Sequence, residues 1–133
     1  MQTLRRAVRA RPRFQRAGGR ACAPAGPPTP VQELNTEFDD RMPNVSPDGL
    51  EIVFSSTRPT DANGTPAFGS FDVYVSTRRS TRHPWSAPVN LGANVNTAGS
   101  ETRSSMSADR KRLYFGRDGD IYSSTRHWLR GRH

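Results

Sequence analysis

The sequence lacks several features that would place it in a familiar class of protein. Cys22 is the only cysteine, so no disulfide can form within the chain and cysteine usage does not reveal the redox compartment. No apolar run approaches the roughly 18 residues of a membrane helix. The pair Arg5-Arg6 is not followed by the apolar segment of about 7–15 residues that a twin-arginine signal requires. Neither a transmembrane segment nor a signal peptide is therefore predicted.

The chain is also poor in residues that build a hydrophobic core. Leu, Ile, Val and Phe make up about 17% of the 133 residues, below the roughly 20% typical of self-sufficient domains. Ordering the backbone of each residue costs about 1–2 kcal/mol, so little buried apolar surface means marginal stability. We therefore expect a core that is local, or one that is completed by something outside this chain.

Acidic residues are absent from residues 1–32, which hold seven arginines, whereas the other 101 residues carry 13 basic and 12 acidic side chains. Seven of the eight net positive charges thus belong to an N-terminal arm, residues 1–30, and the rest of the chain is close to neutral. Its repelling charges, and the four prolines in the stretch 24–30, predict disorder. The arm is a candidate for non-specific polyanion binding, although Phe14 is its only aromatic side chain for base stacking.

Beyond the arm the sequence repeats itself, which implies two stacked units of one kind. The pairs aligned at a shift of 61 positions include Asp40 with Glu101, Ser46 with Ser107, Asp48 with Asp109, and residues 52–54 with 113–115. The pairs aligned at a shift of 48 are residues 72–74 with 120–122 and Ser76-Thr77-Arg78 with Ser124-Thr125-Arg126. The difference of 13 positions is the extra length of the first unit's loop around residues 60–70.

Each unit has the pattern of short strands joined by turns, and no window shows a helical period. In the segment 46–49 (Ser-Pro-Asp-Gly), proline and a terminal glycine predict a turn. The strands expected from β-branched and aromatic runs are residues 51–56 and 71–77 in the first unit, and 104–107, 113–116 and 120–123 in the second. The apolar triplets 52–54 and 113–115 predict strands that are buried on both faces.

Two segments resemble a known repeat. Residues 45–56 (Val-Ser-Pro-Asp-Gly-Leu-Glu-Ile-Val-Phe-Ser-Ser), followed by residues 72–75 (Asp-Val-Tyr-Val), resemble the WD40-like β-propeller repeat of the Pro-Asp-Gly type, best known from the translocation protein TolB. Residues 85–92 and 95–101 are similar to the variety found beside OmpA-like domains. The repeat-motif residues, all given a structural role, are Ser46, Pro47, Asp48, Gly49, Asp72, Tyr74, Trp85, Ser107, Asp109, Asp120, Tyr122 and Trp128.

The resemblance implies an all-β fold, a partial propeller of about two four-stranded blades, with residues 31–94 as the first and residues 95–133 as an incomplete second. The second unit stops before any counterpart of residues 88–92, so its fourth strand is expected to be missing. Since propellers close with about 4–8 blades, the chain is expected to be a fragment of a longer propeller or one member of a ring of several copies. Arg110 replaces Gly49 in the second turn, at a cost of about 1 kcal/mol if this position takes positive φ.

Residue types that could carry chemistry have plainer explanations. The loop Asp61-Ala62-Asn63-Gly64-Thr65 lacks the ligands of a calcium loop and favours an ordinary Asn-Gly loop, and Asn63 also begins a formal glycosylation sequon. Asp48 and Asp109 lie inside turns, which favours side-chain-to-backbone hydrogen bonds over acid–base catalysis.

For the acids Asp72 and Asp120 and the arginines Arg78 and Arg126, we expect ion pairs or edge charges within each unit. His83, His127 and His133 have no metal-ligand spacing, no catalytic triad is indicated, and Trp85 is expected to pack its indole on the sheet.

These observations predict a binding protein and not an enzyme, without cofactor or metal. The expected function is a protein-interaction or scaffold surface, in the periplasm or cell envelope if the resemblance holds, with loops 58–70 and 78–85 as the binding surfaces. One alternative is an accessory propeller part of a sugar- or peptide-processing enzyme, and another is polyanion binding through the arm. Sheet faces on which no other sheet packs predict self-association. A homo-oligomer whose copies together complete a propeller is a further alternative.

Overall fold

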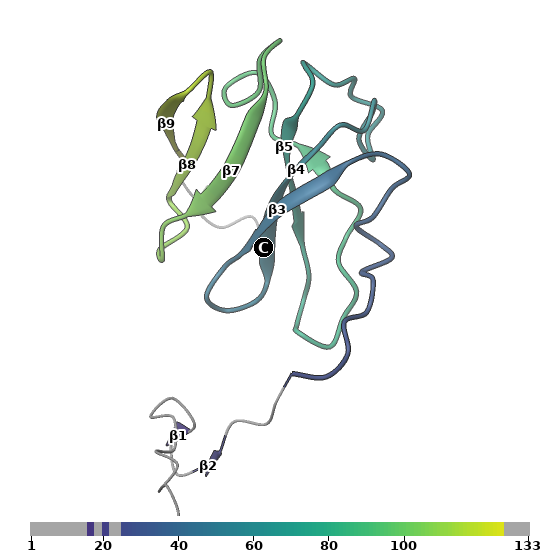
Figure 1. The fold of residues 1–133 in the computed structure, drawn as a ribbon, viewed down its shortest axis with the longest axis vertical. Coiled ribbons are helices and arrows are strands. Elements are labelled where there is room, and N and C mark those ends of the chain that lie inside the picture. Colours follow the sequence, from purple (N-terminus) through teal and green to yellow (C-terminus); the bar gives the residue numbers. More distant parts are fainter. Residues whose placement is uncertain (1–15, 18–19, 22–24, 127–133) are drawn as a thin grey trace, which may run out of the picture.

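A computed structural model of the chain describes residues 16–17, 20–21 and 25–126 (Figure 1). This part is all-β and contains no helix, as the sequence predicts. Two antiparallel sheets make up its body, and they do not close into a ring within the described residues.

A third, small pairing lies in the N-terminal arm. Strands β1 (Arg16–Ala17) and β2 (Arg20–Ala21) form a two-residue antiparallel ladder, which is set apart from the two sheets in Figure 1. The rest of residues 1–24, including Cys22, lies outside the described residues. The disorder expected for the arm therefore stays a prediction for that part, while these four residues differ from it.

The first sheet has four strands in chain order. They are β3 (Asp40–Val45), β4 (Glu51–Ser56), β5 (Asp72–Thr77) and β6 (Val89–Asn90). Every residue of β4 is buried, which confirms the prediction of a strand buried on both faces. The turn between β3 and β4 uses Pro47 and Asp48 at its centre, and Gly49 has the positive φ of 75° that glycine permits.

The second sheet has three strands in its described part, and the expectation that a fourth strand is missing stays a prediction. They are β7 (Glu101–Met106), β8 (Arg112–Arg117) and β9 (Asp120–Thr125). Asp118 and Gly119 join β8 to β9 and both have positive φ, as two-residue hairpin turns require. Both sheets also share a register irregularity in their first strand, where Met42 and Arg103, counterparts at the shift of 61, have φ of 55° and 53°.

Because side chains alternate along a strand, each sheet has two faces, and counterpart residues define them alike. The front face carries Ile52, Phe54 and Tyr74 in the first sheet, and their counterparts Leu113, Phe115 and Tyr122 in the second. The back face carries Glu51, Val53 and Val73 in the first sheet, and their counterparts Arg112, Tyr114 and Ile121 in the second.

The core lies in two clusters, one on each side of the first sheet. Its back face packs on the front face of the second sheet, where Val53 and Val73 meet Val95 and Phe115, with β7 beside β3 and β4 (Figure 1). On its front face, the second cluster consists of Leu34, Ile52, Phe54, Tyr74 and Trp85. The two sheets therefore stack front to back, in the same sense.

The prediction for the triplet 113–115 is wrong in one respect. Phe115 is buried, but on the back face Tyr114 is 42% exposed and the neighbouring Ile121 is 84% exposed. The apolar pattern indicates a face that is suited to burial, but the face is buried only where another sheet or segment packs on it. No described residues form a sheet that covers the back of the second sheet.

Candidate interaction surfaces

The two Pro-Asp-type turns have the same hydrogen bonds. Ser46 donates its hydroxyl to Asp48 at 2.6 Å, and the same carboxylate oxygen accepts the Leu50 backbone N–H at 3.0 Å. In the second unit Ser107 and the Lys111 N–H donate to Asp109 at 2.7 and 3.0 Å. The bonds from the Leu50 and Lys111 N–H groups are the local side-chain-to-backbone contacts that the sequence predicts. Arg110 has φ of 60°, so this non-glycine residue does adopt the left-handed conformation of Gly49.

These turns predict an acid-sensitive contribution to stability. Hydrogen bonds from Ser46 and Ser107, followed by those from the backbone, lower the pKa of Asp48 and Asp109 below the ordinary value of 3.8. A lowered folded-state pKa contributes stability that is present above pH 3.8 and is lost as pH falls through the folded-state pKa. We expect the double variant Asp48→Asn, Asp109→Asn to lose less of its melting temperature than the parent between pH 5 and pH 2. Equal losses in thermal melts would contradict this assignment.

A buried arginine organises the front face of the first sheet. Arg58, only 7% exposed, lies over the rings of Phe54 and Tyr74, at 5.0 and 5.1 Å from their centroids. It donates to Asp40 at 2.7 Å and to the Leu34 carbonyl oxygen at 2.7 Å. Burial alone would raise the pKa of Asp40, but the hydrogen bonds from Ser56 and Arg58 outweigh it and lower that pKa. Arg58 is therefore part of the core, which corrects its assignment to a binding loop.

The second unit repeats this arrangement around Arg117. Its guanidinium lies over Phe115 and Tyr122 at 5.4 and 4.6 Å, and donates to Glu101 at 3.2 Å and to the Val95 carbonyl oxygen at 2.6 Å. The shift of 61 aligns Arg117 with Ser56 and not with Arg58, so alignment of the repeat missed it. The acids Asp40 and Glu101, which align in the repeat, could have indicated that each unit contains a basic partner for its acid.

Ion pairs or edge charges were expected within each unit, but Asp72 forms no ion pair with Arg78, and Asp120 forms none with Arg126. Asp72 is fully buried and accepts hydrogen bonds from the Phe68 N–H and the Asn90 side chain, at 2.7 and 3.0 Å, while Asp120 is exposed. Arg78 lies over the Trp85 indole at 4.0 Å, and Arg126 pairs with Glu51 of the other sheet. The prediction considered each unit alone, whereas stacking of the two sheets places Glu51 of the first sheet next to Arg126 of the second.

The remaining candidates have ordinary structural roles. Asp61 accepts backbone N–H groups from Asn63, Thr65 and Asn90 at 2.8–2.9 Å, which ties the Asn-Gly loop to β6. Trp85 is buried in the front-face core, which confirms that its indole packs on the sheet. His83 is exposed and contacts Ser80, whereas the predictions for His127, Trp128 and His133 fall outside the described residues.

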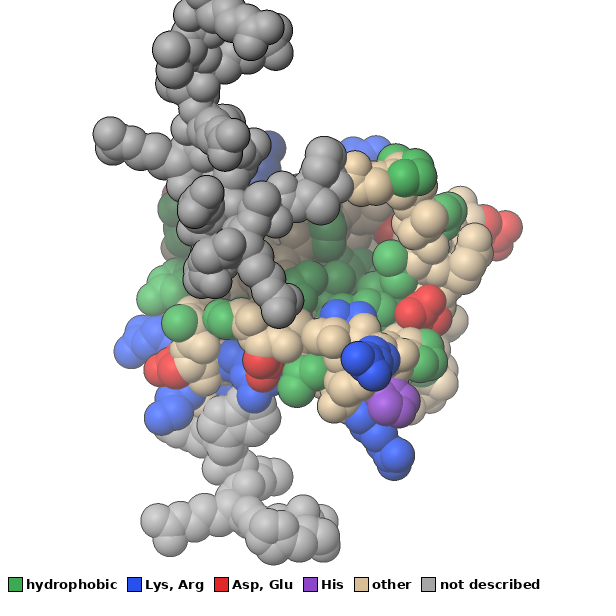
Figure 2. All heavy atoms as spheres, turned by 90° about the horizontal axis from the view of Figure 1, so that it is seen from below, with side chains coloured by type: hydrophobic (Ala, Val, Ile, Leu, Met, Phe, Trp, Pro, Cys, Tyr) green, Lys and Arg blue, Asp and Glu red, His purple; other side chains and the backbone are tan. Residues whose placement is uncertain are grey.

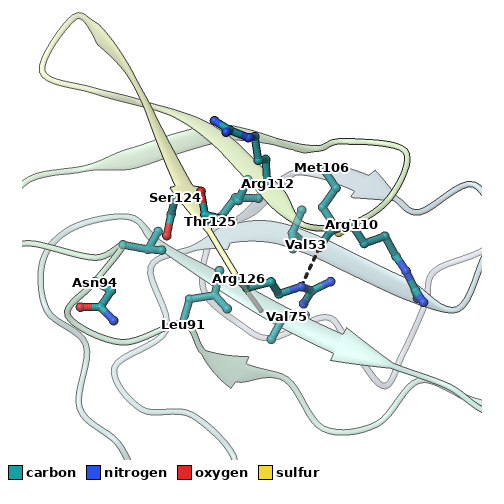
Figure 3. Close-up of a pocket in the computed structure, with 12 residues that line it drawn as sticks. Val53, Val75, Leu91, Asn94, Met106, Arg110, Arg112, Ser124, Thr125 and Arg126 are labelled. Carbon is teal, nitrogen blue, oxygen red and sulfur yellow. Dashed lines mark hydrogen bonds between the residues drawn. The ribbon is translucent and has the colours of Figure 1, made fainter. Parts of the chain in front are cut away.

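The junction between the sheets combines an apolar centre with charged pairs. Val53 and Val75 of the first sheet, together with Leu91, line a cavity of about 190 Å³ opposite residues of the second sheet (Figure 3). The Glu51 carboxylate, 5% exposed, binds both terminal nitrogens of Arg126. A second pair joins the two turns, with Arg110 3.4 Å from Asp48.

The front face of the first sheet has an open apolar groove of about 260 Å³. The residues that line it include Val31, Leu34, Val45, Ile52 and Phe54. Val31 and Val45 are 41% and 46% exposed, so their apolar surface faces solvent. Seen from below, hydrophobic side chains gather in a hollow of the molecule with basic side chains near its edge (Figure 2). The groove is therefore a candidate for a contact with another molecule.

Comparison with protein-family models, with curated proteins and with solved structures found no match in any of the three. The propeller-type resemblance therefore stays a prediction. In residues 16–17, 20–21 and 25–126, no helix is long and apolar enough to cross a membrane. Across the same part of the chain, no group of three or more His, Cys, Asp or Glu side chains is placed to hold a metal ion.

Proposed function

We propose that this chain is a non-catalytic, propeller-type repeat module that serves as an interaction or scaffold surface, and that the groove on the front of the first sheet receives the back of a further sheet of the same kind. One observation carries the proposal. The groove residues Leu34, Val45, Ile52 and Phe54 have the counterparts Val95, Met106, Leu113 and Phe115. All four counterparts form the junction with the back of the first sheet. The junction within this molecule thus shows how the back of one sheet fills the corresponding groove of the next.

The energetics favour an occupant for the groove. In the existing junction Val53 is 3% exposed and Val73 is fully buried, and full burial of one valine contributes about 1.5–3 kcal/mol. An incoming sheet with such residues would bury Val45, which is now 46% exposed, and would pack on Ile52. Heterologous, front-to-back contacts propagate into rings or open stacks, which suits a repeat scaffold.

The carboxylates of the turns support a structural role. The Oδ1 atoms of Asp48 and Asp109 each accept a hydroxyl and a backbone N–H of their own turn. A carboxylate held in this way stabilises the turn and is a poor proton acceptor at neutral pH, because its pKa is lowered.

A chain with one added repeat tests the proposal. Leu34 is the counterpart of Val95, so residues 34–94 can be duplicated in tandem with a junction, 94 to 34, that reproduces the natural one. In this tandem chain the back of the first copy faces the groove of the second. We expect the free energy of unfolding to rise by about 2–4 kcal/mol over the parent, measured by urea unfolding, because two valines become buried in the groove.

The matched control is the same tandem chain with Val53→Asp in the first copy only. This substitution places a carboxylate in the new junction and leaves the original junction intact. If the tandem chain were no more stable than this control, the groove would not accept a repeat sheet and the proposed function would be wrong.

A further inference from the structure

The charged groups around the stacking surfaces indicate which sheet the groove accepts, an inference that rests on the proposed function. In the existing junction, Glu51 on the back of the first sheet meets Arg126 at the front of the second. Arg126 is held for this contact, because its Nε donates to the Arg110 carbonyl oxygen at 2.7 Å. The pair is thus a buried carboxylate opposite a positioned guanidinium.

The front of the first sheet has a counterpart guanidinium, which here lies over the Trp85 indole at 4.0 Å and near Glu33. Arg78 is the counterpart of Arg126, and its Nε donates at 2.7 Å to the carbonyl oxygen of Gly49, the counterpart of Arg110. Arg78 forms none of the ion pairs found in the described part of the chain. The nearby Glu33 is engaged with the Trp85 N–H at 3.1 Å. Arg78 is therefore placed to receive a carboxylate from whatever covers the groove.

The other junction pair has no equivalent at this groove. Gly49 stands where Arg110 stands in the second unit, so a counterpart of Asp48 on an incoming sheet would meet no cation there. At the position equivalent to the Glu51–Arg126 pair, charge selection then depends on Arg78, while Asp40 and Arg41 are the charged residues that line the groove itself.

The chain's own open back face carries the wrong charge for this groove. Arg112 is the counterpart of Glu51, pairs with Thr125 as Glu51 pairs with Thr77, and is exposed. Stacking of a second copy would place Arg112 against Arg78, and like charges across an interface select against such a partner.

We propose that the front of the first sheet selects a repeat sheet that carries a carboxylate at the position of Glu51, and rejects the second sheet of its own copies. The occupant is thus an acidic-strand repeat and not the second sheet of a further copy of this chain. A ring made of several copies, left open by the sequence, is disfavoured by the two arginines.

The tandem chain supplies a defined probe, because Glu51 of its first copy faces Arg78 of its second. We would compare Glu, Gln and Arg at position 51 of the first copy, each with Arg78 or with Arg78→Glu in the second copy, by urea unfolding. With Arg78, the unfolding equilibrium constant is expected to be lowest for Glu, which gives the most stable chain, and at least about tenfold higher for Arg. With Arg78→Glu the order should reverse, so that Arg at position 51 recovers most of the loss.

A flat series at position 51, or an Arg78→Glu background that does not reverse the order, would overturn the charge rule. The Val53→Asp control separates this failure from failure of the proposed function. A flat series in a tandem chain that is still more stable than the control defeats only the charge rule, whereas no gain over the control defeats both. Light scattering of the unmodified chain gives a second check: we expect a monomer, and an oligomer that Val45→Asp disperses would overturn the proposal.

Discussion

Replacement of Arg117 by Met is expected to lower the free energy of unfolding by about 3–5 kcal/mol. The side chain of Glu101 is fully buried, and its Oε1 depends on Arg117 and Thr97 for hydrogen bonds. Its Oε2 already has no hydrogen-bond partner within the described residues. Removal of the guanidinium would leave a buried carboxylate without its counter-charge, and would also remove the cation that lies over Phe115 and Tyr122.

Urea unfolding of the whole chain measures this effect, and two variants serve as comparisons. Arg41→Met removes an ion pair with Asp39 in which both side chains are more than half exposed, so we expect a change of about 1 kcal/mol or less. The double variant Arg117→Met, Glu101→Leu removes both charges and should recover part of the loss. An Arg117→Met chain as stable as the Arg41→Met chain would show that Arg117 does not hold the second sheet together.

Replacement of Gly69 by Ala is expected to destabilise the chain by about 3 kcal/mol, through a backbone clash at the junction between the sheets. A Cβ atom on Gly69 would lie 2.1 Å from the carbonyl oxygen of Gly99 and 2.4 Å from that of Thr97. The neighbouring backbone also joins the sheets, since the Ser70 N–H donates to the Gly99 carbonyl oxygen at 3.3 Å. Flexible side chains could move aside, but here backbone must shift, and the contact between loop 66–71 and residues 97–99 would open.

Thermal melts measure this loss, which for a domain of this size corresponds to a decrease of roughly 10–20 °C in melting temperature. Gly26→Ala is the matched control, because a Cβ at that position meets nothing within 4 Å. Equal melting temperatures for the two variants would contradict close backbone packing at Gly69.

Sequence reasoning was most successful where neighbouring residues decide the outcome. The strand 51–56 and the turns at Asp48 and Asp109 follow from β-branched residues and from short polar side chains that bond to their own backbone. Arg117 was missed because it lies two positions away from the place that aligns with Arg58. The two guanidinium groups nevertheless lie over counterpart rings in their two sheets.

The sequence by itself determined the all-β class, the two repeat units and the chemistry of their turns, because these depend on alternation along a strand and on contacts within a few residues. Only the tertiary structure decided which faces are covered and which charges meet. The pairing of Glu51 with Arg126 joins residues 75 positions apart, and it exists because one sheet stacks on the back of the other. Alternation assigns a side chain to a face of its sheet, whereas the neighbouring sheet decides whether that face is buried and which charge lies opposite.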